Sequence, residues 1–598
     1  MSEEYPVHWL EQYYKQILAR NTDIINLSTG KTPSGHIHLG ILREIIICDA
    51  LRRLFEKQGK KVNFRLFFDS LDAAKRFPDY VLQRSKILTK DHLGKPFAHI
   101  PDPYGTGAKS YAHLFAQELL DALVYFGVKI EPIFADDLYK TKEMFDAIKI
   151  GLDNSDKVRE IISRYNPLED NWRPAMAICE KCGRTQQKIA TEVCTKCNAI
   201  QSDKDAKICG ACGHDKLKQD SAILPNRVIN YDKDKGLCYY ECPSCHHKGA
   251  VRYDSGFIKL NWRLDWPSKW YIYKTTCEPA GKDHCTKNGS YDTGLAISRE
   301  LYGYEGPVPL PYEWVRLGVN DMSTSQGIVF TPNEYLSMAP PEIFRMVILT
   351  THNLKHIAFR IEELESYIEE YYRMERIYYG VEKEVSKEIV NEVRFVFPLI
   401  QIDEKKELPA DIPENCPEHL PFKLVESFAQ LTTIISTKEL YKKAMKYITD
   451  YSLKVSISEQ DFELTIKRMQ KWLLKMRELI GGEKDPTKKK ILESKVSLFT
   501  ISETLDQSIL KKITEQDKQI MKAFVDNLET IPENKWNNDT FKDMMMNLQK
   551  QLNIKPNVMF KPLYLILVGS EKGPRLGPLM ELIDRAWLIN RLKNAVNS

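Results

Sequence analysis

Residues 24–40 have the sequence IINLSTGKTPSGHIHLG, and they decide the fold. Residues 24–28 form a short apolar stretch typical of a buried strand, and residues 29–35 form a turn rich in glycine and proline. An amphipathic helix is predicted from about residue 38 to 57, and a second strand over 62–68. Strand, glycine-rich turn, helix and strand in this order open a doubly wound α/β domain, in which a phosphate binds above the strand end at the helix N-terminus.

Length and composition bound the possibilities. The chain has 598 residues, which suits about three to five domains. Its 86 Lys+Arg against 82 Asp+Glu exclude a general polycation, so any nucleic-acid surface must be a local patch. No apolar run approaches the roughly 20 residues of a membrane helix. The first four residues, MSEE, are unlike a targeting peptide, so we expect a cytoplasmic protein with no membrane contact.

Residues 32–40, TPSGHIHLG, resemble the PSGxxHIGH signature of class I aminoacyl-tRNA synthetases. In that family a histidine on the first helical turn contacts the triphosphate of ATP. The aligned residue is His38, and Ile41 departs from the histidine or asparagine of relatives. The resemblance implies these ATP-binding residues: Pro33, Ser34, Gly35, His38, Gly40, Ser323 and Ser325.

Segments further along the chain are similar to the class I lysyl-tRNA synthetases. They are NWRLDWP at 261–267, EPAGKDH at 278–284, GSYD at 289–292, PYE at 311–313 and GPRLG at 573–577. Recognition of lysine requires a carboxylate for the ammonium and aromatic walls for the four-carbon stem. The resemblance implies a substrate pocket of Gly30, Thr32, Trp262, His284 and Tyr312, with Glu278 and Asp283 as the acidic candidates. The alternative to a substrate-binding role is core packing for the aromatic residues, and an exposed loop position for the acidic ones.

Residues 321–327, DMSTSQG, align with the second signature of the family, KMSKS. The Met-Ser core is retained, but Asp321 and Gln326 replace the two lysines that stabilise the transition state. Loss of one such donor typically costs on the order of 100- to 1,000-fold in rate. Lys282 is one candidate for a replacement cation. The resulting catalytic candidates are His38, Lys282, Met322 and Ser323.

Eight cysteines form four CxxC pairs between the two halves of the predicted catalytic domain. Paired thiolates at this spacing are typical of tetrahedral Zn²⁺, and eight ligands would hold two ions. Nested pairing predicts one site from the outer pairs and one from the inner pairs. The outer ligands are Cys179, Cys182, Cys242 and Cys245, and the inner ligands are Cys194, Cys197, Cys209 and Cys212. No catalytic open-site pattern appears, so the zinc is expected to be structural. Reduced buried cysteines, the alternative, do not explain four repeats of one spacing.

The last part of the chain is predicted to be helical, with helices over 341–354 and 357–378 among others. Lysine runs at 442–443, 488–490 and 511–512 would contact tRNA phosphates, although such runs are more often solvated faces. Trp472 and Trp536 are expected to be exposed, where they could stack on anticodon bases.

The sequence therefore predicts an α/β Rossmann-like class I synthetase catalytic domain with a zinc-binding insertion, followed by an all-α anticodon-binding region. The boundaries are 1–170 and 256–340 for the catalytic halves, 171–255 for the insertion, 341–390 for a connecting element and 391–598 for the anticodon-binding region. The expected reaction joins lysine to tRNA-Lys through lysyl-adenylate, with ATP and Mg²⁺, in a monomer. A weakened paralogue that binds tRNA or a partner, and a synthetase for another amino acid such as glutamate, are the alternatives.

Overall fold

The computed structural model describes residues 7–168, 172–196, 200–201, 208, 212–317, 320–321, 330–402, 416–502 and 504–598. The chain forms two compact units. Unit 1 comprises Met1–Tyr335, Pro341–Phe359 and Glu384–Leu408, and unit 2 comprises Leu336–Pro340, Arg360–Lys383 and Pro409–Ser598. The predicted connecting element at 341–390 is thus divided between the two units.

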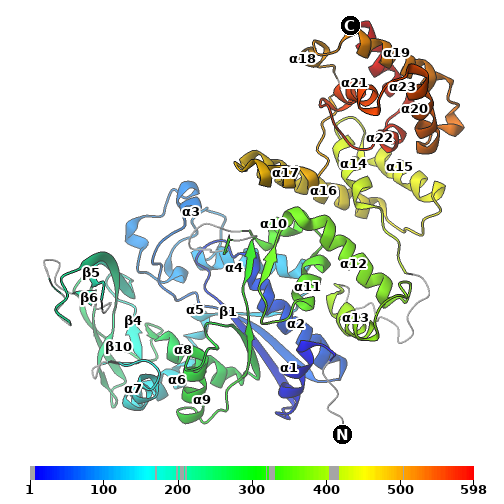
Figure 1. Cartoon of the computed structure of the whole chain (residues 1–598). Coiled ribbons are helices and arrows are strands. Elements are labelled where there is room, and N and C mark those ends of the chain that lie inside the picture. The colour runs from blue at the N-terminus through cyan, green and yellow to red at the C-terminus, as the bar shows by residue number, and fades with distance from the viewer. Residues whose placement is uncertain are drawn as a thin grey trace. The chain divides into compact units, whose positions relative to one another are not determined.

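Unit 1 is built on a five-stranded parallel sheet with the order β13-β12-β1-β2-β3 (Figure 1). Its strands are β1 (Ile24–Lys31), β2 (Lys61–Phe68), β3 (Glu131–Phe134), β12 (Cys277–Gly281) and β13 (Val308–Tyr312). The helices α1 (Trp9–Leu18), α2 (Leu42–Lys57) and α4 (Tyr111–Tyr125) accompany the first strands. The strand order reverses between β1 and β12, and ligands of open α/β sheets bind at the carboxyl ends of the strands beside such a reversal. The predicted α/β fold of the catalytic domain is confirmed.

The segment between β3 and β12 contains helices and then the cysteine-bearing insertion, which Figure 1 draws in cyan to green. The helices are α5 (Ala135–Leu138), α6 (Lys142–Asp153) and α7 (Ser155–Ser163). The strands are β4 (Ala175–Ala177), β5 (Gln186–Cys194), β6 (Ile200–Gln201), β7 (Leu217–Pro225), β8 (Val228–Asp232), β9 (Leu237–Glu241), β10 (Lys248–Arg252) and β11 (Ile258–Leu260). β4 pairs with β11, so the two ends of the insertion meet before α8 (Trp262–Tyr273) returns the chain to the sheet, and α9 (Ser290–Glu300) follows β12.

A small second sheet, β15-β14-β16, follows the main sheet in unit 1. Its strands are β14 (Val315–Leu317), β15 (Asn320–Asp321) and β16 (Ile357–Phe359), and the neighbouring helices are α10 (Pro332–Leu336), α11 (Pro341–Thr350) and α13 (Lys387–Ile400). The predicted helix over 357–378 is wrong at its start, because β16 pairs in parallel with β14. Ile357 and Phe359 are buried while Ala358 between them is exposed, which is the alternation of a strand.

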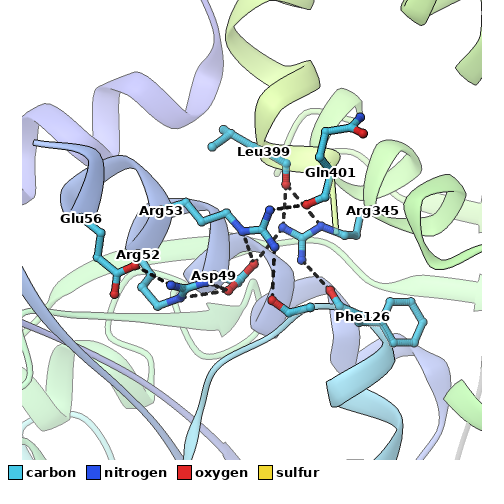
Figure 2. Close-up of polar contacts among 9 residues, drawn as sticks. Asp49, Arg52, Arg53, Glu56, Phe126, Arg345, Leu399 and Gln401 are labelled. Carbon is cyan, nitrogen blue, oxygen red and sulfur yellow. Dashed lines mark hydrogen bonds and ion pairs between the residues drawn. The ribbon is translucent and has the colours of Figure 1, made fainter. Parts of the chain in front are cut away.

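Helix α2, which follows the signature turn, is fixed by a buried cluster of charges (Figure 2). Asp49 and Arg345 are fully buried and form an ion pair of 2.8 Å. Arg345 also donates to the carbonyl oxygens of Phe126 and Leu399, at the ends of α4 and α13. Burial would raise the pKa of Asp49, but Arg345 and the arginines of α2, Arg53 among them, hold it below its usual value. The cluster ties α2 to the ends of two other helices.

Unit 2 is helical throughout its described residues apart from turns and loops. Its longer helices are α12 (Leu364–Tyr378), α14 (Phe422–Leu431), α15 (Thr437–Asp450), α16 (Glu459–Gly482), α17 (Pro486–Lys495), α19 (Glu515–Thr530), α20 (Asn538–Leu552), α21 (Pro556–Val568), α22 (Leu576–Leu582) and α23 (Arg585–Asn597). Within the described parts of the chain, none of the helices combines the length and hydropathy that a bilayer span requires.

The two tryptophans expected to be exposed in unit 2 are buried, so that prediction is wrong. Trp472 is fully buried and its indole N–H donates to the Ile361 carbonyl oxygen. Trp536 is 8% exposed, and its ring lies edge-on to Phe541 and beneath the Arg585 guanidinium. Burial of these two rings stabilises the helical packing of the unit, because each large aromatic side chain removes much apolar surface from water. Neither presents a free face for stacking on a base.

Candidate active site and metal centre

The two histidines of the motif at 32–40, His36 and His38, have different surroundings. His38 precedes the short 3₁₀ helix Leu39–Ile41 that leads into α2, and its Nδ1 accepts the N–H of Gly40 at 3.2 Å. Burial, together with the nearby charge of Lys31, lowers the pKa of His38 to about 3, so its imidazole is neutral. His36 instead lies 2.5 Å from a Glu118 carboxylate oxygen and contributes to the surrounding packing.

A cavity of about 310 Å³ lies at the carboxyl ends of β1 and β12, where the strand order reverses. We call it the first cavity. Its lining residues are Gly30, Lys31, Ile41, Glu44, Phe67, Asp69, Asp72, Lys259, Trp262, Asp265, Trp266, Lys269, Glu278, Pro279, Ala280, Gly281, His284, Tyr312 and Trp314. A Cβ at Gly281 would lie 2.9 Å from the Trp314 ring, so glycine is needed for that ring to approach. The predicted residues Gly30, Trp262, His284 and Tyr312 come together here.

Carboxylates outnumber lysines in the first cavity by five to three. Lys269 is bound to Asp69 at 2.6 Å and Asp265 at 2.8 Å. Lys259 is bound to Asp72 at 2.8 Å. Asp69 and Asp72 lie 200 and 187 residues before the lysines that they bind, whereas Asp265 lies one helical turn before Lys269. The sequence motifs did not indicate a site role for any of these five residues. One available signal was that Asp69 and Asp72 directly follow β2 at the ligand-binding edge of the sheet.

Thr32 and Tyr312 act through carboxylates of the first cavity. The Thr32 hydroxyl donates to Asp72 at 2.9 Å, although Thr32 itself is outside the lining. The Tyr312 hydroxyl donates to Glu44 on α2, as does the Thr29 hydroxyl. Burial raises the pKa of Glu44 to about 7, against the opposing effect of these hydrogen bonds. Glu44, which the sequence motifs did not indicate, therefore titrates nearer to neutral pH than an ordinary glutamate.

The two acidic candidates from the sequence differ in position. Glu278 is buried in β12 and accepts hydrogen bonds from Ser28 at 2.6 Å and from the indoles of Trp266 and Trp270 at 2.8 and 2.7 Å. Burial raises the pKa of Glu278 while these donors lower it. Asp283 is exposed and does not line the cavity. The structure brings only Glu278 of the two into the first cavity.

A second cavity, of about 270 Å³, adjoins the first beside the signature turn. Its lining residues are Lys31, His38, Gly40, Ile41, Tyr312, Trp314 and Val315. Four of these residues also line the first cavity: Lys31, Ile41, Tyr312 and Trp314. Pro33, Ser34 and Gly35 lie in the turn between Lys31 and His38. The arrangement provides two adjoining compartments, one of them next to the signature histidine.

The remaining catalytic and ATP-binding candidates do not appear among the described residues that line the two cavities. Met322, Ser323 and Ser325 lie outside the described part of the chain. Lys282 lines neither cavity and forms an ion pair of 2.7 Å with Glu313. The Glu313 carboxylate also lies 3.2 Å from His356.

The outer cysteine pairs come together in the insertion. The sulfur atoms of Cys179, Cys182, Cys242 and Cys245 all lie within 4.8 Å of one another, and two of the separations are 3.6 Å. Four sulfurs around Zn²⁺ at tetrahedral geometry are separated by about 3.8 Å, so the donor set and its spacing fit this ion. The inner prediction, of Cys194, Cys197, Cys209 and Cys212, falls largely on residues outside the described part of the chain.

The two outer knuckles have the same backbone turn. Gly183 donates its N–H to the Cys179 carbonyl at 2.8 Å, and His246 donates to the Cys242 carbonyl at 2.8 Å. Both donors have positive φ, 72° and 55°. Positive φ is uncommon for residues other than glycine, but histidine adopts it more often than most, so His246 can make the turn that Gly183 makes in the other knuckle. Each turn directs two thiols toward one point.

Comparison with known families agrees with this geometry. The profile of a family described as "tRNA synthetases class I (K)" matches residues 7–222 and 219–397, which include both cavities and the cysteine cluster. The chain belongs to this class I tRNA synthetase family. A second profile, described as "Anticodon binding domain", matches residues 487–596 of the synthetase, in unit 2. The resemblance noted in the sequence is confirmed.

The synthetase is also similar to curated proteins along nearly its whole length. It is 29% identical to a lysine--tRNA ligase of Methanocaldococcus jannaschii, over 98% of this chain and 99% of the relative. It is 28% identical to a lysine--tRNA ligase of Methanococcus maripaludis, with the same coverage. It is 27% identical to a lysine--tRNA ligase of Archaeoglobus fulgidus, over 99% of this chain and 100% of the relative.

Proposed function

We propose that this synthetase activates lysine with ATP and transfers it to tRNA-Lys. The observation that carries the proposal is the first cavity, which combines aromatic walls with two more carboxylates than lysines. Lysine brings two ammonium groups and one carboxylate, so it complements this charge. The names of the similar archaeal proteins support the same substrate.

In the proposed complex the lysine side chain lies along the rings of Trp262 and Tyr312. Glu278 accepts one ammonium group. A carboxylate has about four acceptor positions, and protein donors use three of those on Glu278, which leaves one on Oε1. The triphosphate occupies the second cavity beside neutral His38, where the positive end of the α2 helix dipole also favours phosphate. Mg²⁺ offsets the charge of the triphosphate when ATP is bound.

The reaction has two steps. A carboxylate oxygen of lysine forms a bond with the α-phosphorus of ATP, and the bond to the β-phosphate oxygen breaks, releasing pyrophosphate. A hydroxyl of the terminal tRNA ribose then attacks the carbonyl carbon of lysyl-adenylate, and AMP leaves. The protein contributes position and charge, because phosphoryl transfer needs little covalent participation from the enzyme.

The cysteine cluster is proposed to hold a structural Zn²⁺ through Cys179, Cys182, Cys242 and Cys245, and the inner cysteine pairs to hold a second. Four thiolates complete a tetrahedral shell and leave no position for a substrate. We further propose that the protein acts as a monomer, because one chain supplies all the described residues that line the two cavities.

Lysine-dependent ATP–pyrophosphate exchange tests the proposal, with glutamate in parallel. Exchange with lysine alone is expected, because a glutamate side chain would require a cationic pocket and two of the three cavity lysines are already paired. Charging of tRNA-Lys transcript tests the second step. Exchange with glutamate would assign another amino acid, and no exchange with any amino acid would favour a non-catalytic tRNA-binding protein.

A further inference from the structure

Adenylation brings two anions together, so the site needs a cation at the point where they meet. The lysine carboxylate must approach the α-phosphate against Coulomb repulsion, and charge develops on the departing pyrophosphate. In this chain residues 321–327 have Asp321 and Gln326 at the positions aligned with the signature lysines. Another positive group must therefore supply the missing charge if the protein is an active synthetase.

The cations around the two cavities are distinguished by their partners. Lys259 and Lys269 are occupied by Asp72, Asp69 and Asp265. His38 is neutral. Lys282, the candidate from the sequence, is paired with a glutamate and lines neither cavity.

Lys31 differs from these groups. It lines both cavities, and its ammonium forms no ion pair or hydrogen bond with any residue that the structure describes. It lies at the junction of the two compartments, where the carboxylate and the α-phosphate would react.

We propose that Lys31 is the catalytic cation of adenylation, binding between the carboxylate of lysine and the α-phosphate of ATP. The proposal rests on the proposed function, because it requires both substrates. Lys31 is the last residue of β1, and its backbone pairs with Phe68 of β2. Its carbonyl oxygen also accepts the Asp69 N–H at 3.1 Å. The sheet therefore fixes the backbone from which the Lys31 side chain extends, and a positive group at this point can stabilise the charge that develops in the transition state.

The surroundings of Lys31 support a role that depends on a bound anion. Burial lowers the pKa of Lys31, and the Glu44 carboxylate opposes that effect. An anionic substrate beside the ammonium favours its charged form further. Substrate binding is therefore expected to raise the fraction of Lys31 that carries a positive charge.

The test measures ATP–pyrophosphate exchange in the full-length, zinc-loaded protein and in Lys31→Met, which keeps most of the side-chain length and removes the charge. We expect the maximal rate to fall about 100-fold or more. Lys31→Arg should retain more activity than Lys31→Met, because it keeps the charge. Lys57→Met is the matched control, since Lys57 is exposed at the opposite end of α2 and should exchange at the parent rate.

A binding measurement separates a lost cation from a damaged fold. Lysinol lacks the carboxylate of lysine, so Lys31→Met should bind lysinol as the parent does and lysine about tenfold more weakly, as expected for loss of one charge-assisted contact. Equal weakening of both ligands would overturn the proposal.

The kinetic outcomes separate the inference from the function on which it rests. An inactive parent would refute the proposed function itself. An active parent with Lys31→Met within threefold of it would overturn only the role of Lys31. A large loss in Lys282→Met with none in Lys31→Met would assign the cation to Lys282 instead.

Discussion

Replacing Glu278 with glutamine tests how the first cavity recognises lysine. The change removes the charge of the one sequence-predicted acid that the cavity contains. A hydrogen bond to a charged group contributes about 1.5–3 kcal/mol, and each 1.4 kcal/mol is about tenfold in binding. Loss of the ammonium contact in Glu278→Gln should therefore raise the KM for lysine about 10- to 100-fold.

The local hydrogen bonds indicate how the glutamine would sit. Ser28 and Trp270 both donate to Oε2, whereas Trp266 alone donates to Oε1. The amide oxygen should keep the pair of donors, which places the amide nitrogen against the Trp266 N–H and leaves that group unsatisfied. Such a group costs about 1–3 kcal/mol, so the variant should also unfold somewhat more easily.

The assay is ATP–pyrophosphate exchange against lysine concentration, with the KM for ATP measured in the same series. Asp283→Asn is the comparison, because it removes an equal charge from the other acid that the sequence suggested. We expect its KM for lysine to change less than twofold, since Asp283 is exposed outside the cavity. An unchanged KM in Glu278→Gln, or a large rise in Asp283→Asn, would refute the assignment of the ammonium contact.

Three further outcomes are expected. Arg345→Met should lower the free energy of unfolding by about 3–5 kcal/mol, because it breaks a buried ion pair and leaves two carbonyl groups without their donor. Urea denaturation measures this loss, and a loss below about 1 kcal/mol would contradict the prediction. The pKa of Glu44 is raised to about 7, so between pH 4.5 and 7 the folded state holds a proton on Glu44 that the unfolded state has lost. The free energy of unfolding should therefore fall as pH rises through this range. Thermal melting at several pH values should show a weaker pH dependence in Glu44→Gln than in the parent. Elemental analysis should find about two Zn²⁺ per chain and one fewer in Cys182→Ser; an unchanged content would exclude the outer site.

Local pattern was sufficient for the main features of the catalytic fold. The apolar run, breaker-rich turn and amphipathic helix at 24–57 are contiguous, so neighbouring residues alone predict β1, the turn and α2. The CxxC spacing likewise carries its own geometry, because two thiols three positions apart share one turn. Pattern was less reliable further along the chain, where residues 357–359 became a strand through pairing with distant β14.

The arrangement of charges in the site was decided only by the tertiary structure. The sequence places Glu278 and Asp283 in one motif, and it indicates Lys282 as a candidate for the replacement cation. Folding buries one acid in β12 and leaves the other in water, and it pairs Lys282 with Glu313 while Lys31 lines both cavities. The effect of a charge depends on its burial and its partners, and in this site those partners lie up to 268 residues away in the chain. The sequence alone therefore determined the family and the kind of chemistry, whereas the packing of distant segments determined which side chains are placed to carry it out.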